Sequence, residues 1–175
     1  MNAQGEKIHA FIDSQNLNLS VRKDIIRQGK VVYNGWPLDF KKFYRYIRDK
    51  YKTDEVFLFI GRKSGNEKLY SFLEGVGYNV IYKPCVEYND GGETKNKGNV
   101  DAELVLHTMI EFPNYQKAII VSGDGDYFCL IEYLERMGKL FKIFIPNKTS
   151  FSSLLRPYLK YAVYVTDIKE GLEKG

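Results

Sequence analysis

The sequence has few of the residues that build disulfide frameworks and zinc sites. Its 175 residues include two cysteines and two histidines, and neither Cys85 nor Cys129 has a CxxC partner or a flanking histidine. Disulfide-stabilised folds need several paired cysteines, and structural zinc needs clustered Cys and His ligands. The sequence therefore predicts two reduced structural thiols and argues against redox and zinc chemistry.

Long apolar runs are also missing. Residues 56–60 and 118–121 are among the longest, far short of the roughly 20 residues that cross a bilayer. The polar start at residues 1–7 runs into a mostly apolar stretch of only five residues, 8–12, too short for the core of a signal peptide. We expect no membrane span and a cytoplasmic location.

The chain lacks a strong excess of either charge. It has 26 basic and 22 acidic residues, a net charge of +4, and a composition that is 27% charged and 44% hydrophobic. These values are typical of a globular domain that buries a core, and they exclude disordered and fibrous proteins. The excess is uneven, because residues 1–60 carry 11 basic and 7 acidic side chains while residues 61–175 carry 15 of each.

Residues 39–52 concentrate this basic charge and interleave it with aromatic rings at five positions. Such a stretch can hold phosphates by charge and stack bases on rings, so Lys41, Lys42 and Arg45 are candidate substrate-binding residues. The alternative is an amphipathic helix whose rings face the core and whose cations are merely solvated.

Apolar runs alternate with helical patterns along the whole chain. Strands are predicted at residues 8–12, 56–60, 79–82, 118–121 and 141–145. Helices are predicted at about residues 17–28, 39–51, 66–74, 100–111, 128–137 and 151–159. Continuously apolar strands separated by helices indicate a three-layer α/β/α, Rossmann-like domain with a central parallel sheet.

The remaining segments complete a single predicted domain over residues 1–175, with a core at about 8–165. Residues 31–37 suit a turn or a small hairpin, and residues 87–98 a polar loop. The charged tail at 167–175 is expected to fray.

Four aspartates are expected at one edge of the sheet. Asp13 follows the first strand, Asp124 and Asp126 follow the strand at 118–121, and Asp101 begins a helix. Parallel sheets bind ligands at the carboxyl ends of their strands, where the following helices begin. Each aspartate alone suits a helix cap or a turn, but independent capping would not require all four to share one edge.

Clustered carboxylates raise one another's pKa unless a cation neutralises them. Mg²⁺ and Mn²⁺ prefer oxygen ligands and bind through carboxylates together with substrate phosphates. Metal-assisted hydrolysis of a phosphodiester is the chemistry that this set of residues favours.

Three motifs surround these aspartates, namely Phe-Ile-Asp-Ser-Gln-Asn-Leu at 11–17, Lys-Gly-Asn-Val-Asp at 97–101 and Ile-Val-Ser-Gly-Asp-Gly-Asp-Tyr at 120–127. Together they resemble the NYN domain, a branch of the PIN-like nuclease superfamily. The resemblance spans residues 8 to about 165 and implies a sheet of order 3-2-1-4-5 and a Mg²⁺- or Mn²⁺-dependent ribonuclease that acts on RNA, which we expect to be single-stranded.

The resemblance also implies roles for particular residues. Asn16 would orient a ligand carboxylate or bind substrate, and Lys97 would contact phosphate. The metal-site carboxylates and catalytic residues it implies are Asp13, Asp101, Asp124 and Asp126.

One position departs from the family. Many members have an aspartate where this chain has His107, about 9 Å along the helix from Asp101 and therefore better placed to pack than to bind metal. Glu103 lies about 200° around the helix from Asp101 and is not expected in the site.

The departure at His107 leaves a second hypothesis, an RNA-binding or regulatory interaction module on the same fold with weak or no catalysis. A phosphatase with an aspartate nucleophile would need a second Asp where Gln15 stands. The oligomeric state stays open, with a homodimer among the options.

Overall fold

The computed structural model describes residues 5–90, 93–97 and 99–175, and its main element is a six-stranded parallel sheet. The sheet order is β10-β9-β8-β1-β4-β5. The strands are β1 (Ile8–Asp13), β4 (Glu55–Arg62), β5 (Asn79–Pro84), β8 (Lys117–Val121), β9 (Leu140–Ile145) and β10 (Ala162–Tyr164). The five predicted strands lie in the expected order, 3-2-1-4-5, and β10 extends the sheet beside β9, a sixth strand that the sequence analysis missed.

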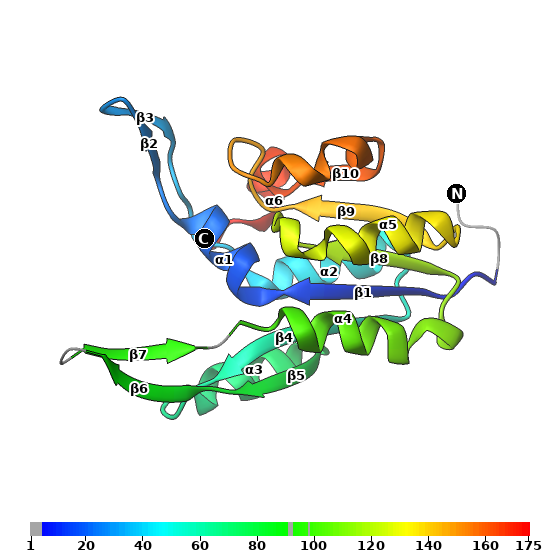
Figure 1. The fold of residues 1–175 in the computed structure, drawn as a ribbon, viewed down its shortest axis with the longest axis horizontal. Coiled ribbons are helices and arrows are strands. Elements are labelled where there is room, and N and C mark those ends of the chain that lie inside the picture. The colour runs from blue at the N-terminus through cyan, green and yellow to red at the C-terminus, as the bar shows by residue number, and fades with distance from the viewer. Residues whose placement is uncertain (1–4, 91–92, 98) are drawn as a thin grey trace.

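Helices cover both faces of this sheet, as expected for three layers (Figure 1). One face is covered by α1 (Ser14–Arg22), α2 (Phe40–Tyr51), α3 (Glu67–Val76) and α6 (Lys169–Leu172). The other is covered by α4 (Asp101–Ile110), α5 (Phe128–Arg136) and the 3-10 helix η3 (Ser153–Tyr161). Short 3-10 turns lie at η1 (Phe112–Asn114), η2 (Gly125–Tyr127) and η4 (Val165–Ile168). Among the described residues, no helix is long and apolar enough to cross a membrane.

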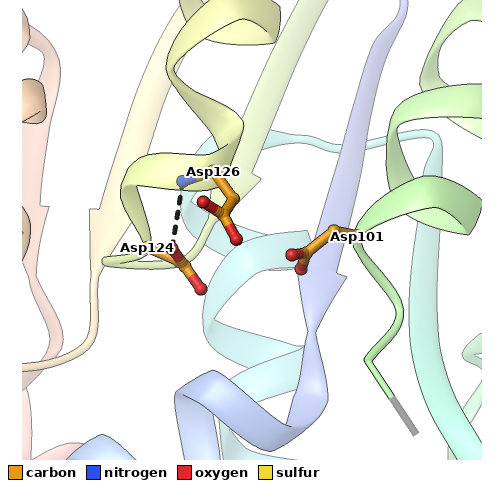
Figure 2. A group of neighbouring side chains, drawn as sticks. All are labelled: Asp101, Asp124 and Asp126. Atoms are coloured by element: carbon orange, nitrogen blue, oxygen red, sulfur yellow. Dashed lines mark hydrogen bonds between the residues drawn. The ribbon is translucent and has the colours of Figure 1, made fainter.

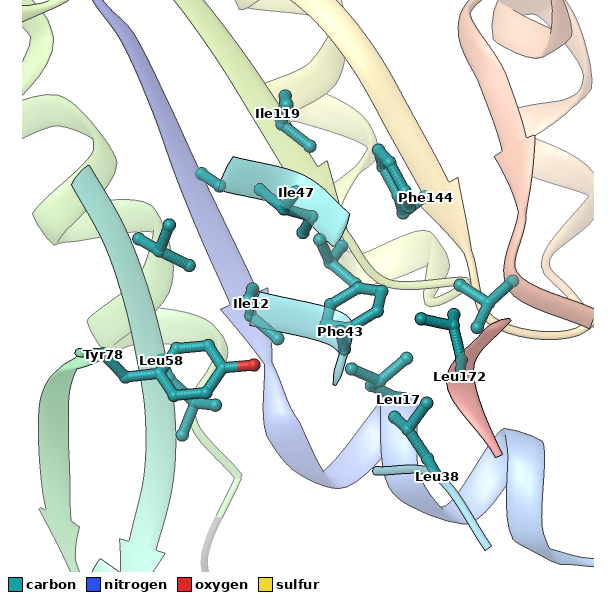
Figure 3. Close-up of a cluster of buried hydrophobic side chains, with 14 of the residues drawn as sticks. Ile12, Leu17, Leu38, Phe43, Ile47, Leu58, Tyr78, Ile119, Phe144 and Leu172 are labelled. Carbon is teal, nitrogen blue, oxygen red and sulfur yellow. The ribbon is translucent and has the colours of Figure 1, made fainter. Parts of the chain in front are cut away.

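The core consists of two layers of side chains, one on each face of the sheet. Alternate residues of β1 point to opposite faces, so Ile8 and Ile12 pack on one side and Phe11 on the other. Figure 3 shows the first layer, where Phe43 and Ile47 of α2 pack against Ile12 and its neighbours. All six residues of β1 are buried, which explains its nearly continuous apolar sequence.

The helix predicted at residues 17–28 is wrong in its second half. α1 ends at Arg22, and an antiparallel hairpin follows, formed by β2 (Ile25–Arg27) and β3 (Lys30–Tyr33). Gln28 and Gly29 both have positive φ, at 51° and 72°. Two such residues form the tight turn that joins hairpin strands, so Gly29 turns a hairpin instead of ending a helix.

Two further segments differ from expectation. The predicted polar loop contains a second hairpin of β6 (Val86–Asp90) and β7 (Glu93–Lys97), which the sequence hides because it lacks apolar alternation. The last predicted helix is the 3-10 helix η3, which contains Pro157, a residue that cannot donate an α-helical hydrogen bond. Figure 1 shows that the β2–β3 and β6–β7 hairpins both extend from the carboxyl edge of the sheet.

The expectation that the tail frays is also wrong. Leu172 is only 1% exposed and packs in the same core layer as α2. Its carbonyl oxygen accepts a 2.8 Å hydrogen bond from the Asp39 amide, and Glu173 pairs with Leu38. The high charge of the tail concealed the one leucine that anchors it.

Leu172→Ala should lower the free energy of unfolding by about 2–5 kcal/mol, the usual cost of truncating a buried leucine. The control is Leu106→Ala, because Leu106 is 58% exposed and its truncation should change stability by about 0.5 kcal/mol or less. Urea titration measures both. If both variants lose equally little stability, Leu172 does not anchor the tail, and the expectation that the tail frays would hold.

Candidate active site

Three of the four predicted aspartates form a compact acidic cluster at the carboxyl edge of the sheet. Asp101 begins α4, and Asp124 and Asp126 lie in the turn that leaves β8. One carboxylate oxygen from each lies within 4.8 Å of the others. Figure 2 shows the three side chains pointing toward one another from two separate segments.

Local hydrogen bonds hold the cluster residues in place. Asp124 Oδ1 accepts a 3.0 Å bond from the Asp126 amide and so caps η2. Asp101 exchanges bonds with Asn99, donating its amide to Asn99 Oδ1 at 2.8 Å and accepting from Asn99 Nδ2 at 2.9 Å. These short-range bonds hold the side chains of Asp101 and Asp124 in place before any ligand binds.

Asp13 lies next to the cluster and is linked to it through Tyr127. Asp13 is 6% exposed, and its Oδ1 accepts a 3.0 Å bond from the Asn16 amide, which caps α1. The hydroxyl of the buried Tyr127 lies 3.0 Å from Asp13 Oδ2 and 2.7 Å from Asp101 Oδ1. One phenolic proton is therefore shared between two carboxylates.

The sequence analysis missed Tyr127. The residue follows Asp126 directly, but adjacency alone does not reveal that its ring turns inward. Its hydroxyl is the structural link between the end of β1 and the start of α4.

The electrostatics of the site favour a cation. Burial raises the pKa of Asp13, with smaller contributions from Asp101 and Asp124, against hydrogen bonds from Asn16 and Tyr127 that lower it. Repulsion from Asp124, followed by interactions with Asp101, raises the pKa of Asp126. The donors are all carboxylate oxygens, so the residues present fit Mg²⁺ or Mn²⁺.

Asn16 has a structural contact that the sequence did not predict. Its side-chain Oδ1 accepts a 2.9 Å hydrogen bond from the Gly123 amide. This bond joins α1 to the loop that carries Asp124. A second predicted substrate contact, Lys97, ends β7, and its side chain lies outside the described residues.

The basic helix α2 supports the alternative reading of an amphipathic helix. Its aromatic side chains belong to the core layer or pack against it, which is the arrangement that an amphipathic helix predicts. Lys42 Nζ donates to the Glu173 carbonyl at 2.7 Å. Lys41, Lys42 and Arg45 are exposed, but none of them lines the pocket beside the acidic cluster.

His107 and Glu103 lie outside the cluster, as expected. The His107 ring packs against Phe59 with centroids 5.6 Å apart. Glu103 pairs with Lys83, with 3.3 Å between Nζ and Oε2. The family aspartate replaced by His107 is therefore not needed to complete the three-carboxylate group.

An open pocket of about 710 Å³ adjoins the cluster, with Asp124 and Asp126 in its wall. Three basic residues from separate segments also line it, namely Arg27 of the β2–β3 hairpin, Lys148 and Arg156. The sequence analysis missed all three, because they come from separate segments and only the fold brings them to one pocket.

The fold and the site together define a class. A parallel α/β/α sheet with carboxylates gathered at the end of its central strand is the architecture of the PIN-like nuclease superfamily. The chain matches the NYN domain over residues 7–164 and belongs to that family, a member of the superfamily.

Two similar proteins accord with this assignment. The chain is 25% identical over 135 residues to the low amplitude and bright protein LabA of Synechococcus elongatus, covering 73% of this chain and 67% of LabA. A crystal structure of a protein of unknown function from Vibrio parahaemolyticus matches with a TM-score of 0.73 at 23% identity, covering 99% of this chain and 100% of that one. The second likeness concerns the fold alone.

Asp126→Asn should raise the thermal unfolding midpoint in EDTA at about pH 7. The folded carboxyl holds its proton more tightly than the unfolded one, whose usual pKa is 3.8. Ionisation of Asp126 therefore costs the folded state stability as the pH rises through the folded pKa. The higher unfolding midpoint of the variant should vanish as the pH falls back toward the usual pKa, where both states hold the proton. Scanning calorimetry across this range measures the difference.

Asp49→Asn is the matched control, because Asp49 is exposed on α2 and lies outside the cluster. It should show no comparable gain that depends on pH. Adding Mn²⁺ should stabilise the wild type more than Asp126→Asn. A gain that is equal at both ends of the pH range would rule out charge repulsion as its cause.

Proposed function

We propose that this protein is a metal-dependent endoribonuclease that hydrolyses RNA phosphodiester bonds at Asp13, Asp101, Asp124 and Asp126. The observation that carries the proposal is the cluster of three carboxylates within 4.8 Å at the carboxyl edge of the sheet. Membership of the NYN family supports it.

Asp101, Asp124 and Asp126 are the residues that would hold Mg²⁺ or Mn²⁺. When bound, such an ion lowers the pKa of a water molecule and neutralises charge that develops on the phosphate. The exposed position of Asp126 leaves the cluster open toward a substrate, whereas Asp101 and Asp124 are half-buried.

The neighbouring residues would keep these carboxylates in position. Tyr127 restrains Asp101 and Asp13 through its hydroxyl. Asn16 holds the Gly123 amide, which fixes the loop ahead of Asp124. Pre-positioned groups lose little freedom when a substrate binds, which is how a rigid site contributes to rate.

Asp124→Asn should abolish Mn²⁺-dependent cleavage of single-stranded RNA, with a loss in kcat/KM of at least about 100-fold. Mutation of a residue that only hydrogen-bonds a metal ligand typically lowers metal affinity or activity by about 10–100-fold, so loss of a ligand itself should cost at least as much. Gel analysis of a labelled RNA with Mn²⁺, Mg²⁺ or EDTA measures the rates. Asp49→Asn, which makes the same change on α2, should cleave like the wild type.

Cleavage that survives in Asp124→Asn, or persists in EDTA, would contradict the proposal. A wild-type protein that binds RNA but never cuts it would favour a binding module on the same fold. Circular dichroism of each variant establishes that the fold is intact.

A further inference from the structure

The pocket beside the acidic cluster combines basic groups with polar ones in a way that the proposed chemistry does not require. Arg27, Lys148 and Arg156 line it together with the carboxylates of Asp124 and Asp126. Cations next to carboxylates often form ion pairs and neutralise them, but here no such pair forms with Asp124 or Asp126 among the described residues. Neither aspartate therefore neutralises the cations of the pocket, and in the described part of the chain Lys148 alone among the three has an ion-pair partner, Asp167.

Each of the three cations has a distinct setting. Arg27 Nη2 donates to the Thr149 carbonyl at 2.6 Å, which holds the hairpin over the loop after β9. Lys148 pairs with Asp167, and both side chains are about half exposed. Arg156 is exposed, with no ion pair or hydrogen bond among the described residues. A guanidinium without a partner is suited to a phosphate.

The same pocket offers an apolar platform. Leu154 is 51% exposed and the partly exposed Phe151 ring packs against Tyr164 at 6.2 Å between centroids. Three hydroxyl-bearing residues, Ser20, Thr149 and Ser150, also line the pocket. Aromatic and apolar surface accepts a base face, while hydroxyls can bond base edges and a ribose 2′-hydroxyl.

The pocket wall is fixed to the acidic cluster. The Ser152 amide donates to the Gly123 carbonyl at 3.0 Å. A Cβ at position 123 would lie 3.3 Å from Phe151 Cβ, so glycine permits the two loops to approach this closely. Any strand held in the pocket therefore lies at a set position relative to Asp124 and Asp126.

We propose that this pocket binds an unpaired RNA strand beside the carboxylates, with phosphates on Arg27, Lys148 and Arg156 and a base against Phe151 and Leu154. The proposal rests on the proposed nuclease function and adds the path of its substrate. The strand is unpaired because a base must leave its stack to lie on an apolar platform. The path runs between the β2–β3 hairpin and η3, not along α2.

The test is binding of a fluorescein-labelled single-stranded RNA in EDTA, followed by anisotropy over a range of salt concentrations. Arg27→Ala with Arg156→Ala should weaken binding by about 10-fold or more. Because each phosphate contact in a single strand contributes about 0.7 to the slope of log K against log salt, the slope should fall by about 1.4. The same sequence as a duplex should bind more weakly.

The matched control is Lys7→Ala with Arg136→Ala. Lys7 precedes β1 and Arg136 ends α5, so both exposed cations lie at the opposite edge of the sheet. This variant loses the same charge and should bind RNA within about 2-fold of the wild type. Lys41→Ala with Arg45→Ala tests the competing surface on α2. Thermal unfolding of each variant establishes that the fold is kept.

The proposal would be overturned by an unchanged RNA affinity and salt slope in the pocket variant, or by an equal loss of affinity in the opposite-edge variant. A larger loss of affinity in the α2 variant, or tighter binding of the duplex than of the single strand, would also overturn it. The same measurements distinguish failure of the proposed nuclease function from failure of the proposed strand path. A wild type that does not cleave in Mn²⁺, with binding still lost in the pocket variant, refutes the nuclease and supports the strand path. Cleavage and binding that are both intact in the pocket variant refute the path alone.

Discussion

The parallel pairing of β1 with β8 is the constraint on which the site depends. Ile12 lies opposite Val121 in the register, so Asp13 and the loop after β8 leave the sheet at the same edge although more than a hundred residues separate them. α4 packs against β1 and begins at that edge, which brings Asp101 there. A slip of one residue would turn Asp13 toward the opposite face of the sheet and separate it from Tyr127.

Carboxylates gathered at one edge of the sheet oppose folding because they repel one another. The structure offsets this by hydrogen bonds in which the two oxygens of one carboxylate have different partners. Asp13 uses Oδ1 to cap α1 and Oδ2 to contact Tyr127. Asp124 likewise uses one oxygen to cap η2 while the residue belongs to the cluster. Capping and ligand binding, which a sequence presents as alternatives, are therefore compatible for the same side chain. The repulsion that remains is expressed in the raised pKa of Asp126.

The features predicted from sequence are those with a local signal. Buried parallel strands are continuously apolar, and each aspartate follows a strand or begins a helix, so five strands and the gathering of Asp101, Asp124 and Asp126 at one edge were predictable. The order of those strands followed from the resemblance to the NYN family. Tyr127 was missed because its direction depends on how α4 and β1 pack. Gly29 was misread because a helix stop and a hairpin turn both place glycine at positive φ.

The β2–β3 hairpin, which stands where the second half of the first helix was predicted, also determines where one part of the basic charge lies. The net excess of +4 lies in residues 1–60, and its densest part, α2, packs its rings into the core. A helix through residue 27 would continue the line of α1, whereas the β2–β3 hairpin carries Arg27 to Thr149 and into the pocket wall. Charge density along a sequence thus says little about where charge converges. Arg27, Lys148 and Arg156 come from separate segments of the chain, and only the fold brings them to one pocket.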